Sequence, residues 1–196
     1  MVDVLNRSEA EKIRFAVIET KFGWLGLISR ECKLLRLIKP LESRNIALEN
    51  LKVMLPESAC ESLDSFGDLP ERLRRYFEGE RVSFEDVPLD LSGYGGFQAR
   101  AVMAAKQIPY GSVVTYAQLA RMAGAEKAAR AAGQAMARNR TPIIVPCHRV
   151  VRADGQVGGF AWGKHWKTEL LALEGIATLP SALNIRVSRG PGNDLI

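Results

Sequence analysis

The sequence has few of the residues that build disulfide frameworks and metal sites. Its 196 residues include three cysteines, Cys32, Cys60 and Cys147, and two histidines, His148 and His165. An odd number of cysteines without paired spacing argues against a disulfide framework. The lack of CxxC and HxxxH spacing argues against a structural zinc site as well. We therefore expect no metal and no cofactor, and we interpret Cys32 and Cys60 as small core or surface residues.

Long apolar runs are missing too. No stretch reaches the roughly 18–20 apolar residues that a membrane-spanning helix needs. Residues 1–15 carry charges of both signs, which is not typical of a secretory signal. The hydrophobic fraction of 47% is enough for a globular core. We expect a protein without a membrane partner, located in the cytoplasm or associated with the nucleoid.

Negative charge is scarce in the second half of the chain. Residues 1–96 hold 14 Lys and Arg against 17 Asp and Glu, a net charge of −3, whereas residues 97–175 hold 11 against 4, a net charge of +7. Residues 176–196 add +1, which completes the overall +5. This asymmetry suggests that the second half meets a polyanion. A solvated basic face without a partner explains the charge alone equally well.

Residues 1–92 predict an α/β domain. Apolar runs at 15–20 and 24–29 have the pattern of a hairpin, and 33–38 predicts a third strand. The spacing of apolar residues then predicts helices at 44–55 and 70–77. The segment 82–89 returns to a strand pattern and ends the domain. Glycines concentrate at 93–96 and mark a domain boundary.

Residues 93–176 predict a mainly helical domain, and 177–196 a loosely attached tail. Helices are expected at 97–106, at about 115–123 with Thr115 as N-cap, at 127–138 and at 167–173. Two short helices joined by a glycine-containing turn are typical of a helix-turn-helix. An ordinary helical hairpin is the alternative, and the pattern alone slightly favours it.

The second helix of this pair is rich in small residues. Residues 127–137 contain six alanines and one glycine. Alanine is the best helix former, so this helix needs no bulky side chains. Small side chains allow a close approach, either to another part of the protein or to a DNA groove, with Arg130 as the long reaching side chain.

The segment around Cys147 has the strongest chemical signal. Pro142 and Pro146 bracket an apolar run, which predicts an extended, stiff chain up to Cys147. A thiol needs a base or a positive environment to become a nucleophile. His148 is the adjacent base and Glu174 could orient it, although neighbours on a strand point to opposite faces, so either the chain turns or a water bridges them. From spacing alone, a cysteine protease or acyltransferase fits as well as an alkyltransferase.

A resemblance decides among these. Residues 97–175 resemble the catalytic domain of the methylated-DNA–protein-cysteine methyltransferases, also called O6-alkylguanine-DNA alkyltransferases. The hallmark Pro-Cys-His-Arg-Val stands at 146–150, and further motifs stand at 139–142, 108–111, 115–120 and 127–131. Within residues 1–96 the resemblance is weak apart from the motif Tyr-Phe-Glu-Gly at 76–79.

The resemblance implies catalytic roles for five residues. Cys147 matches the alkyl acceptor, and His148 and Glu174 match the relay that removes the thiol proton, with His148 acting through a water. Tyr116 matches the phenol that crowds the phosphate beside the target and donates a proton to the leaving guanine. Asn139 matches the residue that braces the helix-turn-helix against the active-site loop.

It also implies a DNA-binding surface and a base pocket. A base inside a duplex hides its O6 atom, so the nucleotide must be flipped out. Arg130 matches the finger that fills the vacated space, and minor-groove binding suits a protein that scans any sequence. Residues expected at the DNA are Tyr116, Lys127, Ala129, Arg130 and Gln134. Residues expected around the base are Pro142, Val150 through its backbone, Phe160 and Trp162.

Two residues depart from the family's usual pattern. Arg140 replaces a frequent proline, which is expected to add positive charge near the DNA. Trp162 replaces a frequent small residue, which is expected to narrow the pocket. Some family members carry zinc in the first domain, but no Cys/His set for it is found here.

The resemblance thus implies a ribonuclease-H-like first domain and a helical DNA-binding second domain in a monomer. The implied reaction is an SN2 transfer from O6-alkylguanine in double-stranded DNA to Cys147, once per molecule, with O4-alkylthymine as a second candidate substrate. Two other hypotheses remain. One is a non-catalytic lesion-binding or regulatory module, like a sister group that lacks the cysteine. The other is a thiol hydrolase that turns over and ignores DNA.

Overall fold

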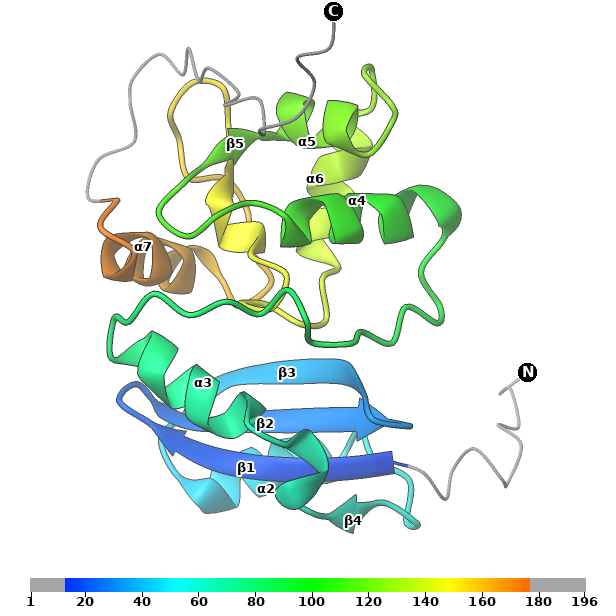
Figure 1. The fold of residues 1–196 in the computed structure, drawn as a ribbon, viewed down its shortest axis with the longest axis vertical. Helices are drawn as coiled ribbons and strands as arrows, with labels where there is room; N and C mark the ends of the chain where they lie inside the picture. Colours follow the sequence, from blue (N-terminus) through cyan, green and yellow to red (C-terminus); the bar gives the residue numbers. More distant parts are fainter. Residues whose placement is uncertain (1–12, 177–196) are drawn as a thin grey trace, which may run out of the picture.

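The computed structural model describes residues 13–176, so the expected tail at 177–196 lies outside the described part. A sheet half (13–77) and a mainly helical half (96–176) are stacked on each other in Figure 1, and a connecting segment (78–95) runs across the boundary between them. The predicted mixed α/β class, with a sheet first and helices second, is confirmed.

A four-stranded sheet forms the sheet half. Its strands are β1 (Ile13–Thr20), β2 (Gly23–Arg30), β3 (Lys33–Leu41) and β4 (Cys60–Glu61). The order is β3-β2-β1-β4; the first three strands are antiparallel, and β4 pairs with β1 in parallel. The predicted hairpin of β1 and β2 and the predicted third strand are confirmed.

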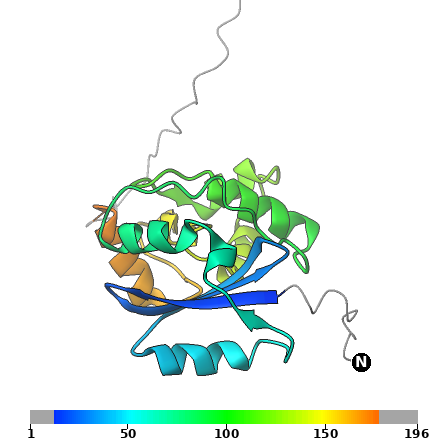
Figure 2. The ribbon, with the colours of Figure 1, turned by 60° about the horizontal axis from the view of Figure 1, so that its bottom comes forward.

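Successive side chains of β1 point to opposite faces of the sheet, and apolar residues lie on both faces. Ala16 and Ile18 pack into the larger core, whereas Phe15 and Val17 pack against a smaller cluster that contains Leu51. Helix α2 (Arg44–Lys52) covers the smaller cluster and α3 (Leu69–Phe77) the larger one, after the short 3-10 turn η1 (Asp64–Phe66). Figure 2 shows the two helices on opposite sides of the strands.

The connecting segment contains no strand, so the prediction of a strand at 82–89 is wrong. Phe84 and Val87 are buried, and Leu89 forms a single bridge to Leu34. Burial therefore explains the apolar pattern without sheet pairing. The carbonyl oxygens of Glu85 and Val87 accept hydrogen bonds from the buried Lys106 Nζ, at 2.9 and 2.6 Å.

The helical half begins with α4 (Gly96–Lys106) and continues with α5 (Tyr116–Met122), α6 (Ala129–Ala137) and α7 (Lys164–Leu173). Strands β5 (Val114–Thr115) and β6 (Val150–Val151) pair in parallel beside them. Thr115 is the N-cap of α5, as predicted: its Oγ1 accepts from Gln118 N, and Gln118 Oε1 accepts from Thr115 N. Helix α6 begins two residues later than expected.

One continuous core joins the two halves. Leu37 and Phe77 of the sheet half belong to the same buried cluster as Ile144 and Leu170 of the helical half. At the rim, Leu37 N donates to Arg140 O at 2.8 Å. The two halves therefore pack as one body across this boundary.

Arg140 fastens the connecting segment to this boundary. Its Nη2 atom donates to the carbonyl oxygens of Asp90 and Ser92, at 2.9 and 2.8 Å. Its guanidinium lies 4.3 Å from the ring centre of Tyr94, in a cation–π contact. The charge expected near DNA is thus turned toward the protein's own backbone.

Within residues 13–176, no helix combines the length and apolar character needed to cross a bilayer. The same residues contain no cluster of three or more His, Cys, Asp or Glu side chains suited to a metal ion.

Candidate active site

Cys147 lies on a tight turn rather than at the end of an extended strand, so the predicted extension over 142–146 is wrong. Val145 N donates to Thr141 O at 2.9 Å, Ile143 has a φ of 76°, and Cys147–Arg149 forms the 3-10 turn η2. Buried backbone groups need partners, and here they bond within the turn and to Asn139. The Asn139 amide accepts from Thr141 N at 3.0 Å and donates to Val145 O at 2.9 Å.

The thiol of Cys147 is almost fully buried, with 1% of the residue exposed. The Asn139 amide, which already holds the turn, also donates to Sγ at 3.0 Å. Burial raises the pKa of the thiol to about 11, although the Asn139 hydrogen bond, the charge of Lys167 and the backbone of Ala161 act in the opposite direction. The resting side chain is therefore a thiol, and it needs a base to become a nucleophile.

His148 and Glu174, 26 positions apart in the chain, form a buried pair. Nε2 of His148 lies 2.7 Å from Oε1 of Glu174, and both side chains are 0% exposed. Glu174 also accepts from Arg149 Nε and Nη2 and, through Oε2, from Gly111 N at 3.1 Å. Burial alone would raise the pKa of Glu174, but the hydrogen bonds from His148 and Arg149 and the positive charge of Arg149 outweigh it and lower the pKa to about 2.

His148 is therefore a neutral base. Burial lowers its pKa, and the attraction of Glu174 offsets this only in part. An ionised carboxylate can only accept hydrogen bonds, so we assign the imidazole proton to Nε2. Nδ1 is buried and has no hydrogen-bond partner among the described residues. That lone pair is available to take a proton.

Tyr76 of the sheet half reaches the same pair, and the sequence did not predict this. Its hydroxyl donates to Glu174 Oε1 at 2.7 Å and lies 3.3 Å from His148 Nε2, and the residue is 0% exposed. The only signal was the motif at 76–79. A tyrosine on the buried face of a helix needs a polar partner for its hydroxyl, which could have directed attention to it.

Lys167 was also missed, because the sequence places it simply in the last helix. It is 0% exposed, and its Nζ donates to Val150 O and, at 3.2 Å, to Gly159 O. Burial lowers its pKa to about 8, and the negative charge that Cys147 carries once it is ionised acts in the opposite direction. Lys167 thus ties β6 to the glycine-rich loop (156–163) beside the thiol.

Tyr116 lies between α6 and the glycine-rich loop. Its hydroxyl donates to Gly159 O at 3.4 Å, and a Cβ atom at Gly158 would meet it at 2.8 Å. On the other side, a Cβ atom at Gly133 would lie 3.7 Å from its ring. Burial, followed by the negative charge that Cys147 carries once it is ionised, raises the pKa of the Tyr116 phenol, so the phenol retains its proton.

The residues expected around the base differ in how deeply they are buried. Pro142 and Val150 are buried, and Phe160 packs edge-on to His148 with ring centres 6.2 Å apart. Trp162 is half-buried and packs edge-on against Phe160 and against Trp166 of α7, at 5.9 and 6.0 Å. It also borders a hollow of about 660 Å³ that reaches β3.

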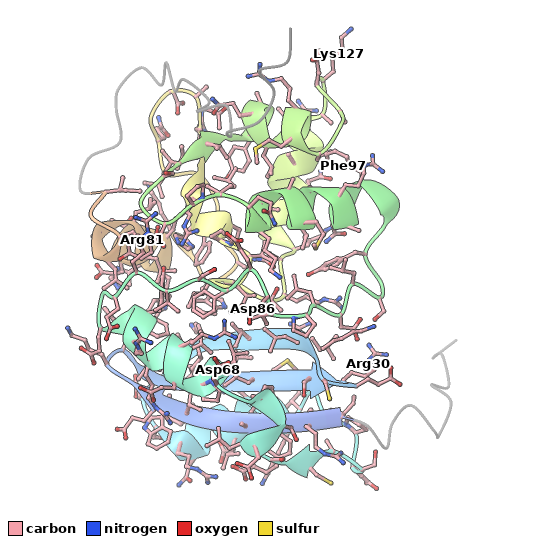
Figure 3. The ribbon with its side chains drawn as sticks, in the orientation of Figure 1. Arg30, Asp68, Arg81, Asp86, Phe97 and Lys127 are labelled. Atoms are coloured by element: carbon pink, nitrogen blue, oxygen red, sulfur yellow. The ribbon has the colours of Figure 1, made fainter. Side chains whose placement is uncertain are left out.

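The expected DNA-contacting residues mostly face outward. Arg130 and Gln134 are exposed on α6, one turn apart, and Ala129 is half-buried. Ala132 and Ala135, on the other side of α6, are buried. Figure 3 shows Lys127 pointing away from the molecule at the turn before α6.

A buried thiol beside a histidine–carboxylate pair is the arrangement of a protein that uses cysteine as a nucleophile. Two family models match this chain. The ribonuclease-like domain of 6-O-methylguanine DNA methyltransferase matches residues 13–91, and the DNA-binding domain of the same family matches residues 96–176.

Similar proteins agree with these models. The methylated-DNA–protein-cysteine methyltransferase of Methanopyrus kandleri is 45% identical over 134 residues, covering 67% of this chain and 98% of the relative. That of Methanosarcina acetivorans is 38% identical over 161 residues, covering 82% and 97%. The Mycobacterium tuberculosis OGT solved in complex with DNA is 34% identical, with a TM-score of 0.69 over 86% of this chain and 96% of that one. The chain belongs to the methylated-DNA–protein-cysteine methyltransferase family.

Proposed function

We propose that this protein repairs DNA by transferring the alkyl group of O6-alkylguanine irreversibly to Cys147. The observation that carries the proposal is the setting of this thiol. It is buried, it accepts a hydrogen bond from Asn139, and it directly precedes a histidine whose free Nδ1 atom can accept a proton. Family membership supports the same reaction.

The hydrogen bonds of His148 and Glu174 support a proton path. The thiol proton leaves through a water to Nδ1 of His148, while Glu174 stabilises the imidazolium that forms. The new bond joins Sγ to the alkyl carbon, and the bond from that carbon to O6 breaks with its electron pair on the guanine. Tyr116, whose phenol retains its proton, supplies the proton that the leaving base takes up.

DNA binding uses the helical half, which carries the net charge of +7. We propose that α5 and α6 form a helix-turn-helix, with α6 in the minor groove and Arg130 occupying the space of a flipped base. Lys127, Ala129 and Gln134 then line the same groove. The complex of the M. tuberculosis relative with DNA supports DNA as the partner.

Pro142, Phe160 and the backbone of Val150 form the base pocket in this proposal, and Trp162 borders it. The protein acts as a monomer in the cytoplasm or on the nucleoid, with domains at 1–92 and 93–176. No cofactor takes part.

The test is an intact-mass measurement after incubation with a duplex that contains O6-methylguanine. We expect each chain to gain one methyl group, which peptide mapping places on Cys147. Cys147→Ala abolishes the gain but leaves DNA binding, whereas Cys32→Ala and Cys60→Ala, at exposed thiols, leave it unchanged. Binding without any mass gain would support a lesion-binding module, and repeated turnover would support a hydrolase.

A further inference from the structure

The sheet half contributes one side chain to the proposed chemistry. Tyr76 lies in the last turn of α3, 72 positions before His148 and 98 before Glu174 in the chain. Its ring packs edge-on with Phe77, Phe84 and Tyr110, at 5.7, 5.9 and 6.2 Å between centres. This packing directs the hydroxyl into the helical half.

The role of the Tyr76 hydroxyl follows from the hydrogen bonds that the Glu174 carboxylate accepts. Oε1 accepts from Tyr76, His148 and Arg149, and Oε2 accepts from Arg149 and Gly111. The phenol has one proton and donates it to the charged oxygen at 2.7 Å, because the ring nitrogen at 3.3 Å carries the imidazole proton and cannot accept. Burial first, and then Glu174, hold the pKa of Tyr76 well above its ordinary value, so this donor is permanent.

We propose that Tyr76 is a positioning residue for alkyl transfer, whose hydroxyl fixes the Glu174 carboxylate and moderates its pull on His148, so that His148 stays neutral with Nδ1 free. This inference rests on the proposed function and deepens it. It also gives the sheet half a direct part in the reaction, beyond support of the fold.

The groups around His148 act on its pKa in opposite directions. Glu174 raises the pKa of His148, whereas burial and the positive charges of Arg149 and Lys167 lower it. A hydroxyl that donates to Glu174 offsets part of the carboxylate charge, and thereby helps to keep the pKa of His148 low. Without it, His148 gains a proton at higher pH and can no longer accept the one from Cys147. The acid limb of the rate profile then moves to higher pH.

Two matched variants test the proposal. Tyr76→Phe removes the hydroxyl and keeps the ring packing. Tyr110→Phe removes the neighbouring hydroxyl, which donates to the backbone carbonyls of Gly79 and Leu173 rather than to Glu174. Both lose hydrogen bonds in the same region, so a merely structural effect would appear in both.

The readouts are the rate of methyl transfer against pH and the imidazole 15N spectrum. The chain has only two histidines, and His165 is exposed and serves as an internal reference. We expect Tyr76→Phe to slow transfer about tenfold at neutral pH, to shift the acid limb upward and to raise the titration midpoint of His148, with His165 unchanged. Tyr110→Phe keeps the wild-type profile.

A Tyr76→Phe protein with the wild-type profile and the wild-type His148 titration would overturn the proposal. Equal slowing in both variants, with His148 unchanged, would do the same, because it would reduce Tyr76 to a packing residue. If the wild-type protein itself gained no methyl group, the proposed function would fail, and that result is separate from either outcome for Tyr76.

Discussion

Tyr116 and Gly158 show how a single missing side chain shapes the site. Gly158 has a φ of 73°, which disfavours any residue with a Cβ atom, and the nearest atom to such a Cβ would be the Tyr116 hydroxyl oxygen at 2.8 Å. The neighbouring Gly159 has open space around it and no such φ. The two adjacent glycines therefore differ in what they tolerate.

We expect Gly158→Ala to displace the Tyr116 hydroxyl and to slow methyl transfer at least about tenfold, since a small misplacement of a reacting group is costly. Backbone strain should also lower the free energy of unfolding by about 1 kcal/mol. Gly159→Ala is the matched control and should stay close to wild type in both. Transfer rates and urea unfolding measure the two effects. If both variants behaved alike, the close approach to Tyr116 would have no part in the reaction.

At the scale of elements, the two faces of α6 have different roles. Ala132, Ala135 and Met136 are buried, whereas Arg130 and Gln134 are exposed. The buried alanines let α6 pack closely on its neighbours, and the exposed face remains free for DNA. The small residues thus serve packing within the protein as well as the proposed groove binding.

Arg130→Ala should slow repair of duplex DNA about tenfold while leaving reaction with the free modified base within about twofold, because only the duplex requires a flipped nucleotide. Lys52→Ala, which removes an exposed charge from the sheet half, is the control for general electrostatics. Single-turnover rates on both substrates give the comparison. Equal losses on duplex and free base would remove Arg130 from the flipping role.

Patterns of neighbouring residues predicted helices and strands well, whereas contacts between distant parts of the chain could not be predicted. The N-cap at Thr115 and the β1–β2 hairpin depend on residues a few positions apart, so both could be predicted from the sequence. The connecting segment has strand-like apolar residues, but Phe84 satisfies that pattern by entering the core. The pairing of His148 with Glu174 could be inferred by resemblance, whereas Tyr76 and Lys167 join the site through tertiary contacts that no spacing reveals.

The turn at 141–145 is a second feature that could not be predicted from the sequence. Pro142 and Pro146 predicted an extended chain, but the Asn139 side chain holds the backbone in a turn by accepting from Thr141 N and donating to Val145 O. A side chain that substitutes for a backbone partner leaves little trace in hydrophobic periodicity.

For the whole molecule, the buried charges of Glu174 and Arg149 couple stability to pH. The pKa of Glu174 is about 2 in the folded protein, below its ordinary 4.5. A lowered pKa stabilises the fold above the ordinary value, and that stabilisation is lost as the pH falls from about 4.5 toward 2. Its size is about 3 kcal/mol at neutral pH.

We expect Glu174→Gln to lower the free energy of unfolding by about 3–5 kcal/mol at neutral pH, since Arg149 is left buried without its partner. The difference in the free energy of unfolding between this variant and the wild type should narrow as the pH falls from about 4.5 toward 2. Glu169→Gln, at a partly exposed position of α7, is the control. Urea unfolding across this range measures both. A gap that stayed constant with pH would contradict a lowered pKa for Glu174.

The continuous core has a consequence for anyone who wishes to shorten this protein. A fragment made of the helical half alone would leave Ile144 and Leu170 without Phe77 and Leu37, and would expose an apolar surface to water. Such a fragment should aggregate rather than work as a small portable repair module. The two halves can therefore be exchanged between relatives only together with the surface that each presents to the other.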